Sequence, residues 1–251
     1  MRLSSHVRIV RHMAFPRVEG ATPADRMESF YGPTAHLYDA FRENRLLHGR
    51  RDLMEMLPLE PGSRLVDLGG GTGNNLEYLA ADRRERCARI TVVDVSASML
   101  EVARERIHRN RWRNVETVHA NATDYRPSDG PVDVVVFSYA LTMMPDWFAA
   151  VDHARSLLRP GGTIAVCDFY VSRKHPADGA VRHAAWRRHV WPAWFSHNNV
   201  FLSADHLPYL RERFATVRLD ERLGRVPYLG ARAPFYLFLG TKPDAKTRPE
   251  T

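Results

Sequence analysis

The sequence has little cysteine and lacks a long apolar run. Its two cysteines, Cys87 and Cys167, lie far apart and form no C-x-x-C pair, which argues against a disulfide framework and predicts a reduced, cytoplasmic protein. No apolar stretch reaches the roughly 18 residues of a membrane span, and the N-terminal arginines precede no apolar signal core. The 12 histidines form no ligand cluster, so we predict no metal site.

The composition is that of a globular protein with a basic balance. A hydrophobic fraction of 44% and a charged fraction of 26% predict a soluble chain with one α/β domain and some additions. Lys and Arg number 36 against 29 Asp and Glu, which gives a net charge of +7. This excess suits nucleic acid, an anionic membrane surface or an anionic substrate, and equally the plain solubility of an arginine-rich protein.

A glycine-rich turn follows the first clear strand pattern, at residues 65–75. The apolar run 65–68 passes into Gly69, Gly71 and Gly73, and a helical pattern is expected to resume at Leu76, Leu79 and Ala80. A dinucleotide fingerprint would have a third glycine where Asn74 stands. Asp67 adds a carboxylate, which repels a pyrophosphate but suits a ligand with an ammonium group and a sulfonium. The alternative is a tight turn that binds nothing.

Two further strands each end in polar residues. Residues 89–94 read as a strand that ends at Asp94, where a nucleotide site places an acid against ribose hydroxyls, and Ser96 caps the next helix. Residues 115–119 read as a third strand and lead to Asn121 and Ala122. The amide oxygen of Asn121 can accept a hydrogen bond from an amino group. Asp124 is the substitute candidate, and a solvated loop is the alternative.

The clearest buried strand covers residues 132–139 and is rich in valine. Its end brings Ser138, Tyr139 and Met143 to the edge where an open α/β sheet binds ligands. Tyr139 can present a ring face to a cation. Further along, Pro160-Gly161-Gly162 ends a helix and opens a fifth strand.

In this order, the five landmarks resemble the class I S-adenosylmethionine-dependent methyltransferases. The resemblance implies an α/β fold with a Rossmann-like seven-stranded sheet, helices on both faces, and S-adenosyl-L-methionine as cofactor. It also implies the cofactor-binding residues Asp67, Gly69, Gly71, Gly73, Asp94, Val95, Met99, Asn121, Ala122 and Ser138. The Asn/Asp-Pro-Pro-aromatic tetrad of methyltransferases that act on amino groups of DNA bases or on glutamine is absent after residue 137.

The segment before the glycine turn is basic and then aromatic. We expect residues 1–22 to be a basic arm that precedes a domain over residues 23–240. Tyr31 and Tyr38 are candidates to line the pocket, because a comparable Tyr-Asp segment folds over the cofactor in many small-molecule methyltransferases. Packing in the core is their alternative role. A helix over residues 40–57 follows, with Arg42, Arg45, Arg50 and Arg51 expected to be mostly solvated.

Residues 170–209 are an aromatic and basic insertion before the last two strands. Trp186, Trp191 and Trp194 fall within nine residues, among Arg and His. A lid over the pocket, a membrane-interface surface, and simple packing onto the sheet are the three interpretations. Pro192 argues against one long helix. Residues 216–222 and 234–240 are predicted as two edge strands with a long connecting loop, and residues 241–251 as a disordered tail.

The insertion also resembles the methyltransferase half of betaine-lipid synthases, through residues 168–174 and 194–203 together with His48-Gly49-Arg50-Arg51. That family trimethylates the amine of diacylglyceryl-homoserine. The resemblance implies a lipid or small-molecule amine substrate, peripheral contact with an anionic membrane, and Tyr31, Tyr38 and Tyr139 around the reacting groups. Arg173 or Arg42 are candidates to hold the substrate carboxylate.

Two other functions compete with this prediction. A quinone or other small-molecule methyltransferase is the first, and an RNA-binding methyltransferase, suggested by the basic charge, is the second. No nucleic acid partner is expected, because the sequence has no additional RNA-binding domain. The oligomeric state is open.

Overall fold

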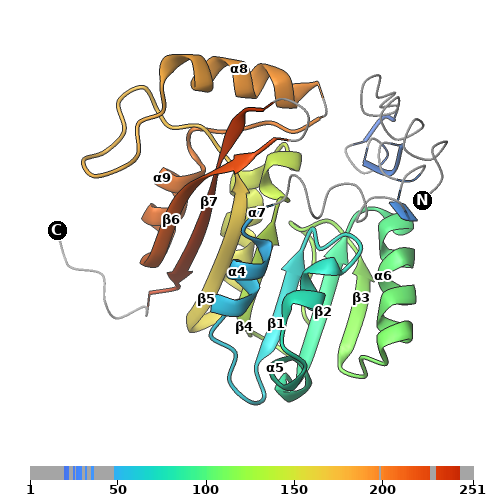
Figure 1. The fold of residues 1–251 in the computed structure, drawn as a ribbon. Helices are drawn as coiled ribbons and strands as arrows, with labels where there is room; N and C mark the ends of the chain where they lie inside the picture. The colour runs from blue at the N-terminus through green and yellow to red at the C-terminus, as the bar shows by residue number, and fades with distance from the viewer. Residues whose placement is uncertain are drawn as a thin grey trace.

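The computed structural model describes residues 20–22, 25, 27–29, 32, 35–36, 48–197, 199–226 and 230–243. Within these residues the chain forms one seven-stranded sheet in the order β3-β2-β1-β4-β5-β7-β6 (Figure 1). The first five strands of this order are parallel, and β7 pairs antiparallel with both β5 and β6. The predicted α/β fold with a Rossmann-like methyltransferase sheet is confirmed.

The elements have the following bounds. The strands are β1 Arg64–Leu68, β2 Arg89–Asp94, β3 Val115–His119, β4 Val132–Ser138, β5 Leu158–Phe169, β6 Ala215–Arg225 and β7 Arg232–Thr241. The helices are α4 Arg50–Met56, α5 Ala81–Arg86, α6 Ala97–Asn110, α7 Trp147–Leu157, α8 Ala185–Ser196 and α9 His206–Arg213, with two 3-10 turns, η2 Asn74–Tyr78 and η3 Leu141–Met143.

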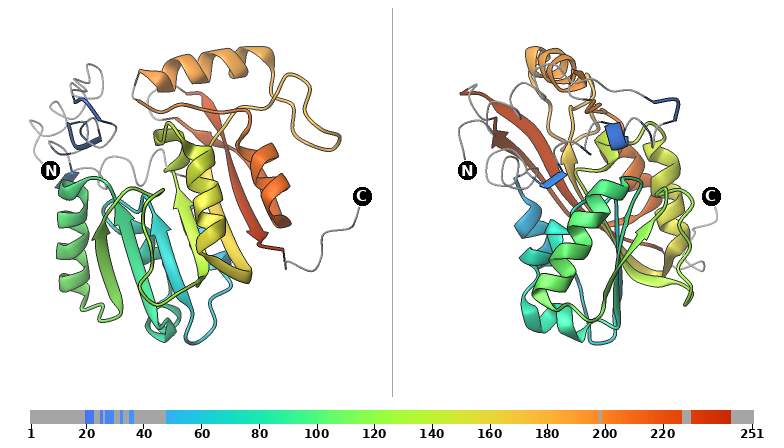
Figure 2. Two further views of the ribbon diagram at one scale, coloured as in Figure 1. Left: turned by 180° about the vertical axis from the view of Figure 1, so that it is seen from behind. Right: turned by 90° about the vertical axis from the view of Figure 1, so that its right-hand side faces the viewer.

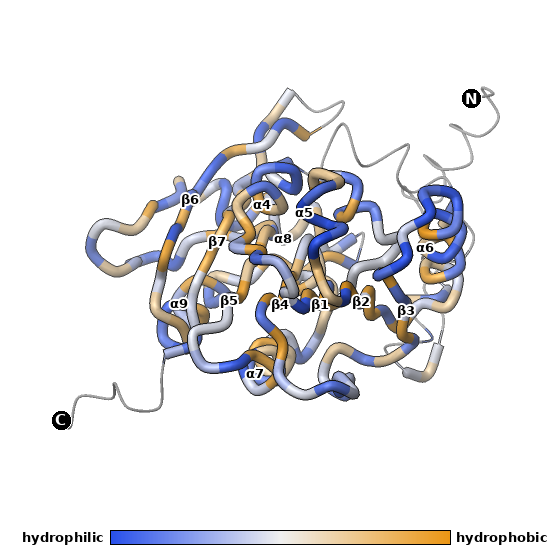
Figure 3. Tube along the Cα trace, turned by 90° about the horizontal axis from the view of Figure 1, so that it is seen from below, coloured by the Kyte–Doolittle hydropathy of each residue, from blue (hydrophilic) through white to orange (hydrophobic). Residues whose placement is uncertain are grey.

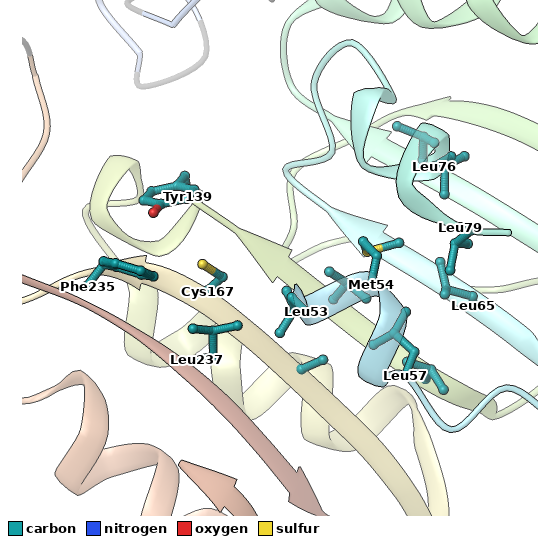
Figure 4. Close-up of a cluster of buried hydrophobic side chains, with 14 of the residues drawn as sticks. Leu53, Met54, Leu57, Leu65, Leu76, Leu79, Tyr139, Cys167, Phe235 and Leu237 are labelled. Atoms are coloured by element: carbon teal, nitrogen blue, oxygen red, sulfur yellow. The ribbon is translucent and has the colours of Figure 1, made fainter. Parts of the chain in front are cut away.

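Each face of the sheet carries its own apolar core, as alternation along a strand requires. Leu65 of β1 packs in a core with Leu53 and Met54 of α4, whereas the next residue, Val66, packs in the core beneath α7 and α9. Figure 4 shows the first of these cores, and Figure 3 shows apolar residues concentrated along the central strands. Helices therefore cover both faces, as Figure 2 also shows.

The glycine turn leads into a shorter helical segment than expected. A 3-10 turn, η2, follows Gly73, and the chain is extended at Leu79 before α5 begins. Leu76 and Leu79 are both buried, but Leu79 lies beyond the end of η2, where the backbone is already extended. The prediction of one helix from the turn was therefore wrong.

The last two strands are longer than predicted, and only one of them is an edge strand. β7 lies between β5 and β6, so β6 alone forms that edge. The two strands extend to Arg225 and from Arg232, which leaves a short connection instead of the long loop expected. Thr241, placed in the tail by sequence, ends β7, and the Lys242 amide donates to the Gly162 carbonyl at 2.8 Å.

The insertion contains one helix and the start of another. α8 continues through Pro192, contrary to the prediction, and α9 begins at His206 and runs beyond the predicted end of the insertion. Burial of Trp191 and Phe195 holds α8 against the body of the protein despite the hydrogen bond that proline cannot donate. Of the helix expected over residues 40–57, the described part is α4. Nowhere in the described part of the chain is a helix long and apolar enough to cross a membrane.

Candidate active site

A cavity of about 160 Å³ opens at the carboxyl ends of β1, β2 and β4, where parallel sheets of this type bind ligands. It brings together most of the residues predicted to bind a cofactor: Gly69, Gly71, Asp94, Val95, Met99, Asn121, Ala122 and Ser138. Tyr139, predicted to lie around the reacting groups, lines it too. Asp67 and Gly73 are not among the lining residues. Tyr31, Tyr38 and Arg42 lie outside the described residues.

The glycine turn is fixed by hydrogen bonds to β2. Gly69 and Gly71 have φ values of 71° and 55°, in the left-handed region that favours glycine. The Gly69 amide donates to the Val93 carbonyl at 2.8 Å, and the Gly71 amide donates to Asp94 Oδ2 at 2.9 Å. The turn therefore holds its backbone against the cavity with no Cβ in the way.

Asp94 is held rigidly at the end of β2. Its Oδ1 accepts from the Ser96 amide at 2.9 Å, in addition to the bond that Oδ2 accepts from Gly71. Burial raises the pKa of the Asp94 carboxyl, and these amide donors oppose that rise. Each carboxylate oxygen retains a lone pair that can accept from a hydroxyl group in the cavity.

Asp67 precedes the glycine turn and does not lie within it. It is a residue of β1, fully buried, and its Oδ2 accepts from Asn75 Nδ2 at 2.8 Å. Burial raises its pKa to about 6, against the lowering effects of Asn75 and the positive charge of Arg50. A direct contact with a ligand ammonium was predicted for Asp67; the residue is not among those that line the cavity, its Oδ2 positions Asn75, and its Oδ1 is buried with no partner among the described residues.

Arg50 is the residue that sequence reasoning missed. It was expected to be mostly solvated, yet it is only 7% exposed and lines the cavity. Its Nε donates to Asn75 Oδ1 at 2.8 Å, which continues the chain Asp67–Asn75–Arg50. Its Nη1 is buried with no partner among the described residues. Its place in the His48-Gly49-Arg50-Arg51 motif was the one signal available, and that motif does not distinguish it from Arg51.

Tyr139 forms part of the cavity wall in a strained backbone conformation. Its φ is 55°, its hydroxyl donates to the His48 carbonyl at 2.7 Å, and its ring lies 4.7 Å from that of Phe169. Burial raises the pKa of the phenol well above its ordinary value, so the side chain is neutral at physiological pH. The neighbouring Ser138 Oγ is buried without a partner in the described structure.

The predicted adenine side of the cavity is only partly as expected. Asn121 and Ala122 both line it, and Asn121 Oδ1 accepts from the Thr123 amide at 3.2 Å, which leaves a second lone pair. Asp124, the substitute candidate, is exposed and is absent from the lining, where Thr123 stands instead. Arg173 also lies away from this cavity and pairs with Asp205 at 2.7 Å.

A short N-terminal piece lies against the site. Met27 lines the cavity, and Glu28 Oε2 accepts from the Ser96 hydroxyl at 2.7 Å, at the start of α6. The Glu28 carboxylate also accepts from the hydroxyl of Ser98. These contacts place residues 27–29 beside Asp94, and no sequence pattern pointed to them.

The comparisons with known proteins agree with this geometry. Residues 66–164 match the family model of a methyltransferase domain. The fold is shared with N-methyltransferase NodS from Bradyrhizobium japonicum, solved with S-adenosyl-L-homocysteine, at a TM-score of 0.64, 17% identity and coverage of 86% of this chain and 98% of that one. It is shared too with phosphoethanolamine N-methyltransferase 2 from Haemonchus contortus, at a TM-score of 0.66, 14% identity and coverage of 90% and 61%.

Among curated sequences, the chain is 28% identical over 168 residues to the ubiquinone/menaquinone biosynthesis C-methyltransferase of Shewanella woodyi, covering 63% of this chain and 64% of the relative. The match thus spans somewhat less than two thirds of that protein's length. Residues 66–164 are thus similar to a methyltransferase domain, and the fold is shared with a protein solved with S-adenosyl-L-homocysteine, which makes S-adenosyl-L-methionine the cofactor expected for this cavity.

The residues present fit this cofactor. Two buried polar atoms at the cavity, Arg50 Nη1 and Ser138 Oγ, have no partner among the described residues, and a ligand that carries a carboxylate and other acceptors would satisfy them. Arg50 and the glycine turn would hold the amino-acid end, Asp94 the ribose hydroxyls, and Asn121 and Ala122 the adenine. Ser138 and Tyr139 would then surround the sulfonium.

Proposed function

We propose that this protein transfers methyl groups from S-adenosylmethionine to the amine of a lipid headgroup, with diacylglyceryl-homoserine as the substrate and diacylglyceryl-trimethylhomoserine as the product. The observation that carries the proposal is the neutral aromatic ring of Tyr139 in the lining of the cavity. The cofactor supplies an electrophilic methyl group on a sulfonium, and the chain supplies orientation and the exclusion of water.

The lining of the cavity favours a nucleophile that needs little help from a base. Among the described lining residues the only carboxylic acids are Asp94 and Asp146. Asp94 is engaged by two amides, and Asp146 is exposed beside α7. Tyr139 is held neutral, and its proton is bonded to the His48 carbonyl. A neutral amine attacks through its lone pair, and a poorly solvated pocket lowers an amine pKa toward that form.

The aromatic lining also suits the product. Tyr139 is the aromatic side chain among the described lining residues, and behind it Phe169 and Phe195 pack in the core, with successive ring centroids 4.7 and 4.6 Å apart. A quaternary ammonium is attracted to such ring faces by the cation–π interaction, and it needs no hydrogen-bond acceptor. The Tyr139 ring can therefore keep a favourable contact with the nitrogen through successive methylations.

Methylation of a quinone ring carbon is the second candidate, and the Shewanella woodyi relative favours it by name. Carbon methylation of a quinol is helped by a base that removes the phenolic proton. The scarcity of free carboxylates and the absence of histidine in the described lining supports the amine instead.

The test is mass spectrometry of products formed from methyl-labelled S-adenosylmethionine. Purified protein is incubated separately with diacylglyceryl-homoserine and with a demethylated quinol, and cofactor binding is measured in parallel by calorimetry. We expect one to three labelled methyl groups on the headgroup nitrogen. Label on the quinol carbon would support the second candidate, and no label on either substrate with cofactor binding intact would refute both.

A further inference from the structure

The outer face of α8 exposes a line of large apolar side chains. Trp186, Val190 and Trp194 recur every fourth residue and are 50%, 50% and 47% exposed. Phe201, just after the helix, is 53% exposed. We call these four residues the α8 surface. A spacing of four places the three helical side chains on one side of α8, and none of them takes part in the cores described above.

The charged residues of the segment that carries the α8 surface are all positive. Residues 179–204 contain Arg182, Arg187 and Arg188 and no aspartate or glutamate. Arg187 stacks over the Trp186 ring at 4.9 Å. Among the described residues none of the three arginines forms an ion pair. Arg182 is exposed, whereas Arg187 and Arg188 are half-buried, and Glu221 of β6 lies near the start of the segment, where its Oε2 accepts from the Val181 amide at 3.3 Å. The surface therefore combines exposed tryptophan with arginines that form no ion pair among the described residues.

The inner face of α8 is joined to the cavity wall. Trp191 and Phe195 are buried, and Phe195 stacks on Phe169, which stacks in turn on Tyr139. The Phe201 amide donates to the Thr142 carbonyl of η3 at 2.7 Å, and Met143 of the same turn lines the cavity. Figure 1 shows α8 lying across the end of the sheet to which the parallel strands point. A partner bound to the outer face of α8 is therefore held close to the cavity.

We propose that the α8 surface docks the protein onto an anionic lipid bilayer, and that this contact delivers the substrate to the cavity. Tryptophan is favoured at the depth of lipid headgroups, and arginine is attracted to anionic lipids. The evidence for docking is the α8 surface. The further claim, that docking delivers the substrate, rests on the proposed lipid substrate. Docking gives these residues a partner that methyl transfer alone does not require.

A second copy of this chain is a poorer occupant of the same surface. In a twofold dimer the surface would meet itself, so the acid-free segment of one chain would face that of the other. Like charges brought together in an interface are costly. A bilayer with anionic headgroups supplies the opposite charge and, at the same depth, an apolar region for the two tryptophans.

The test measures binding to vesicles without cofactor or turnover. The full chain is sedimented with phosphatidylcholine vesicles that contain or lack phosphatidylglycerol, and quenching of tryptophan fluorescence by brominated lipid is recorded. The double variant Trp186→Ala, Trp194→Ala is compared with Phe148→Ala, which removes a 48% exposed aromatic from α7. We expect binding only to the anionic vesicles, a loss of affinity of about tenfold or more in the double variant, and no loss in the control.

Two outcomes would overturn this proposal. One is equal vesicle binding by the wild type and the double variant. The other is the absence of vesicle binding together with a self-association that the double variant abolishes, which would make the surface an interface between copies. Neither outcome depends on methyl transfer, which is measured separately with detergent-dispersed substrate, so failure of the docking surface and failure of the proposed reaction are distinguishable.

Discussion

At the scale of single residues, the site depends on a buried chain of three polar side chains. Asp67, Asn75 and Arg50 are linked by two hydrogen bonds of 2.8 Å, and the last of them reaches the cavity. A buried guanidinium nitrogen without a hydrogen-bond partner lowers the stability of the folded protein unless a ligand accepts its hydrogen bond. These hydrogen bonds therefore orient the Arg50 guanidinium so that it could bind the carboxylate of the cofactor.

Replacement of Arg50 by methionine should weaken cofactor binding. The variant keeps much of the side-chain volume and removes the charge, so the Kd for S-adenosylhomocysteine should rise by about tenfold or more, since hydrogen bonds to charged groups contribute roughly 1.5–3 kcal/mol. Isothermal calorimetry measures the change. Arg51→Met is the matched control, because Arg51 is exposed and absent from the lining, and its affinity should equal that of the wild type. Equal losses in the two variants would contradict this role.

At the scale of elements, the sequence was informative where a pattern is local. The strands ending at Asp94 and His119 and the cap at Ser96, whose hydroxyl accepts from the Met99 amide at 3.2 Å, were all predicted. The α8 helix was not, because Pro192 counts against a helix by itself. Tertiary burial of Trp191 and Phe195 outweighs that local penalty, and no pattern within the segment shows it.

Another element missed from sequence is the contact of residues 27–29 with α6. Glu28 accepts from the Ser96 and Ser98 hydroxyls, and hydrogen bonds from Ser98 and Ser96 lower its pKa against the opposing effect of burial. A carboxylate at the start of a helix is also favoured by the helix dipole. This contact places Met27 at the cavity and so would couple the segment to a ligand bound there.

We therefore expect Glu28→Ala to raise the cofactor Kd several-fold and to increase amide hydrogen exchange at residues 27–29. The free energy that holds this segment over the cavity is lost, whereas the glycine turn and Asp94 are unchanged. Calorimetry and exchange mass spectrometry test the two effects. Glu101→Ala, which removes an exposed carboxylate on the same helix, is the control. An unchanged Kd with increased exchange would show that the segment contributes nothing to binding.

At the scale of the whole molecule, the order of the motifs was enough to predict the fold. Strand β1 leads into glycine and β2 ends in aspartate, and a parallel sheet brings these ends to one edge, whereas Pro160-Gly161-Gly162 marks the start of β5 at the opposite edge. The burial of individual side chains was not predictable in the same way. Arg50 and Arg51 are neighbours of identical type, and only the packing of α4 on η2 decides that one is buried and the other exposed.

Burial of Asp67 should also make the stability of the whole chain depend on pH. Its pKa is raised from 3.8 to about 6, so between these values the folded state binds more protons than the unfolded state. The free energy of unfolding contributed by this group is then highest below pH 4 and falls as the pH rises through 6. A shift of this size corresponds to about 3 kcal/mol. Asp168, with its pKa raised to about 7, acts in the same direction.

The variant Asp67→Asn isolates this effect, because its amide oxygen still accepts from Asn75 and no longer titrates. We expect the variant to be more stable than the wild type at pH 8, with the difference shrinking toward zero near pH 4. Urea unfolding at pH 4, 6 and 8 measures the difference. Parallel curves for the two proteins would mean that the buried carboxylate keeps its ordinary pKa. In that case Arg50 would already offset the cost of burial, and the guanidinium would be less available to a ligand.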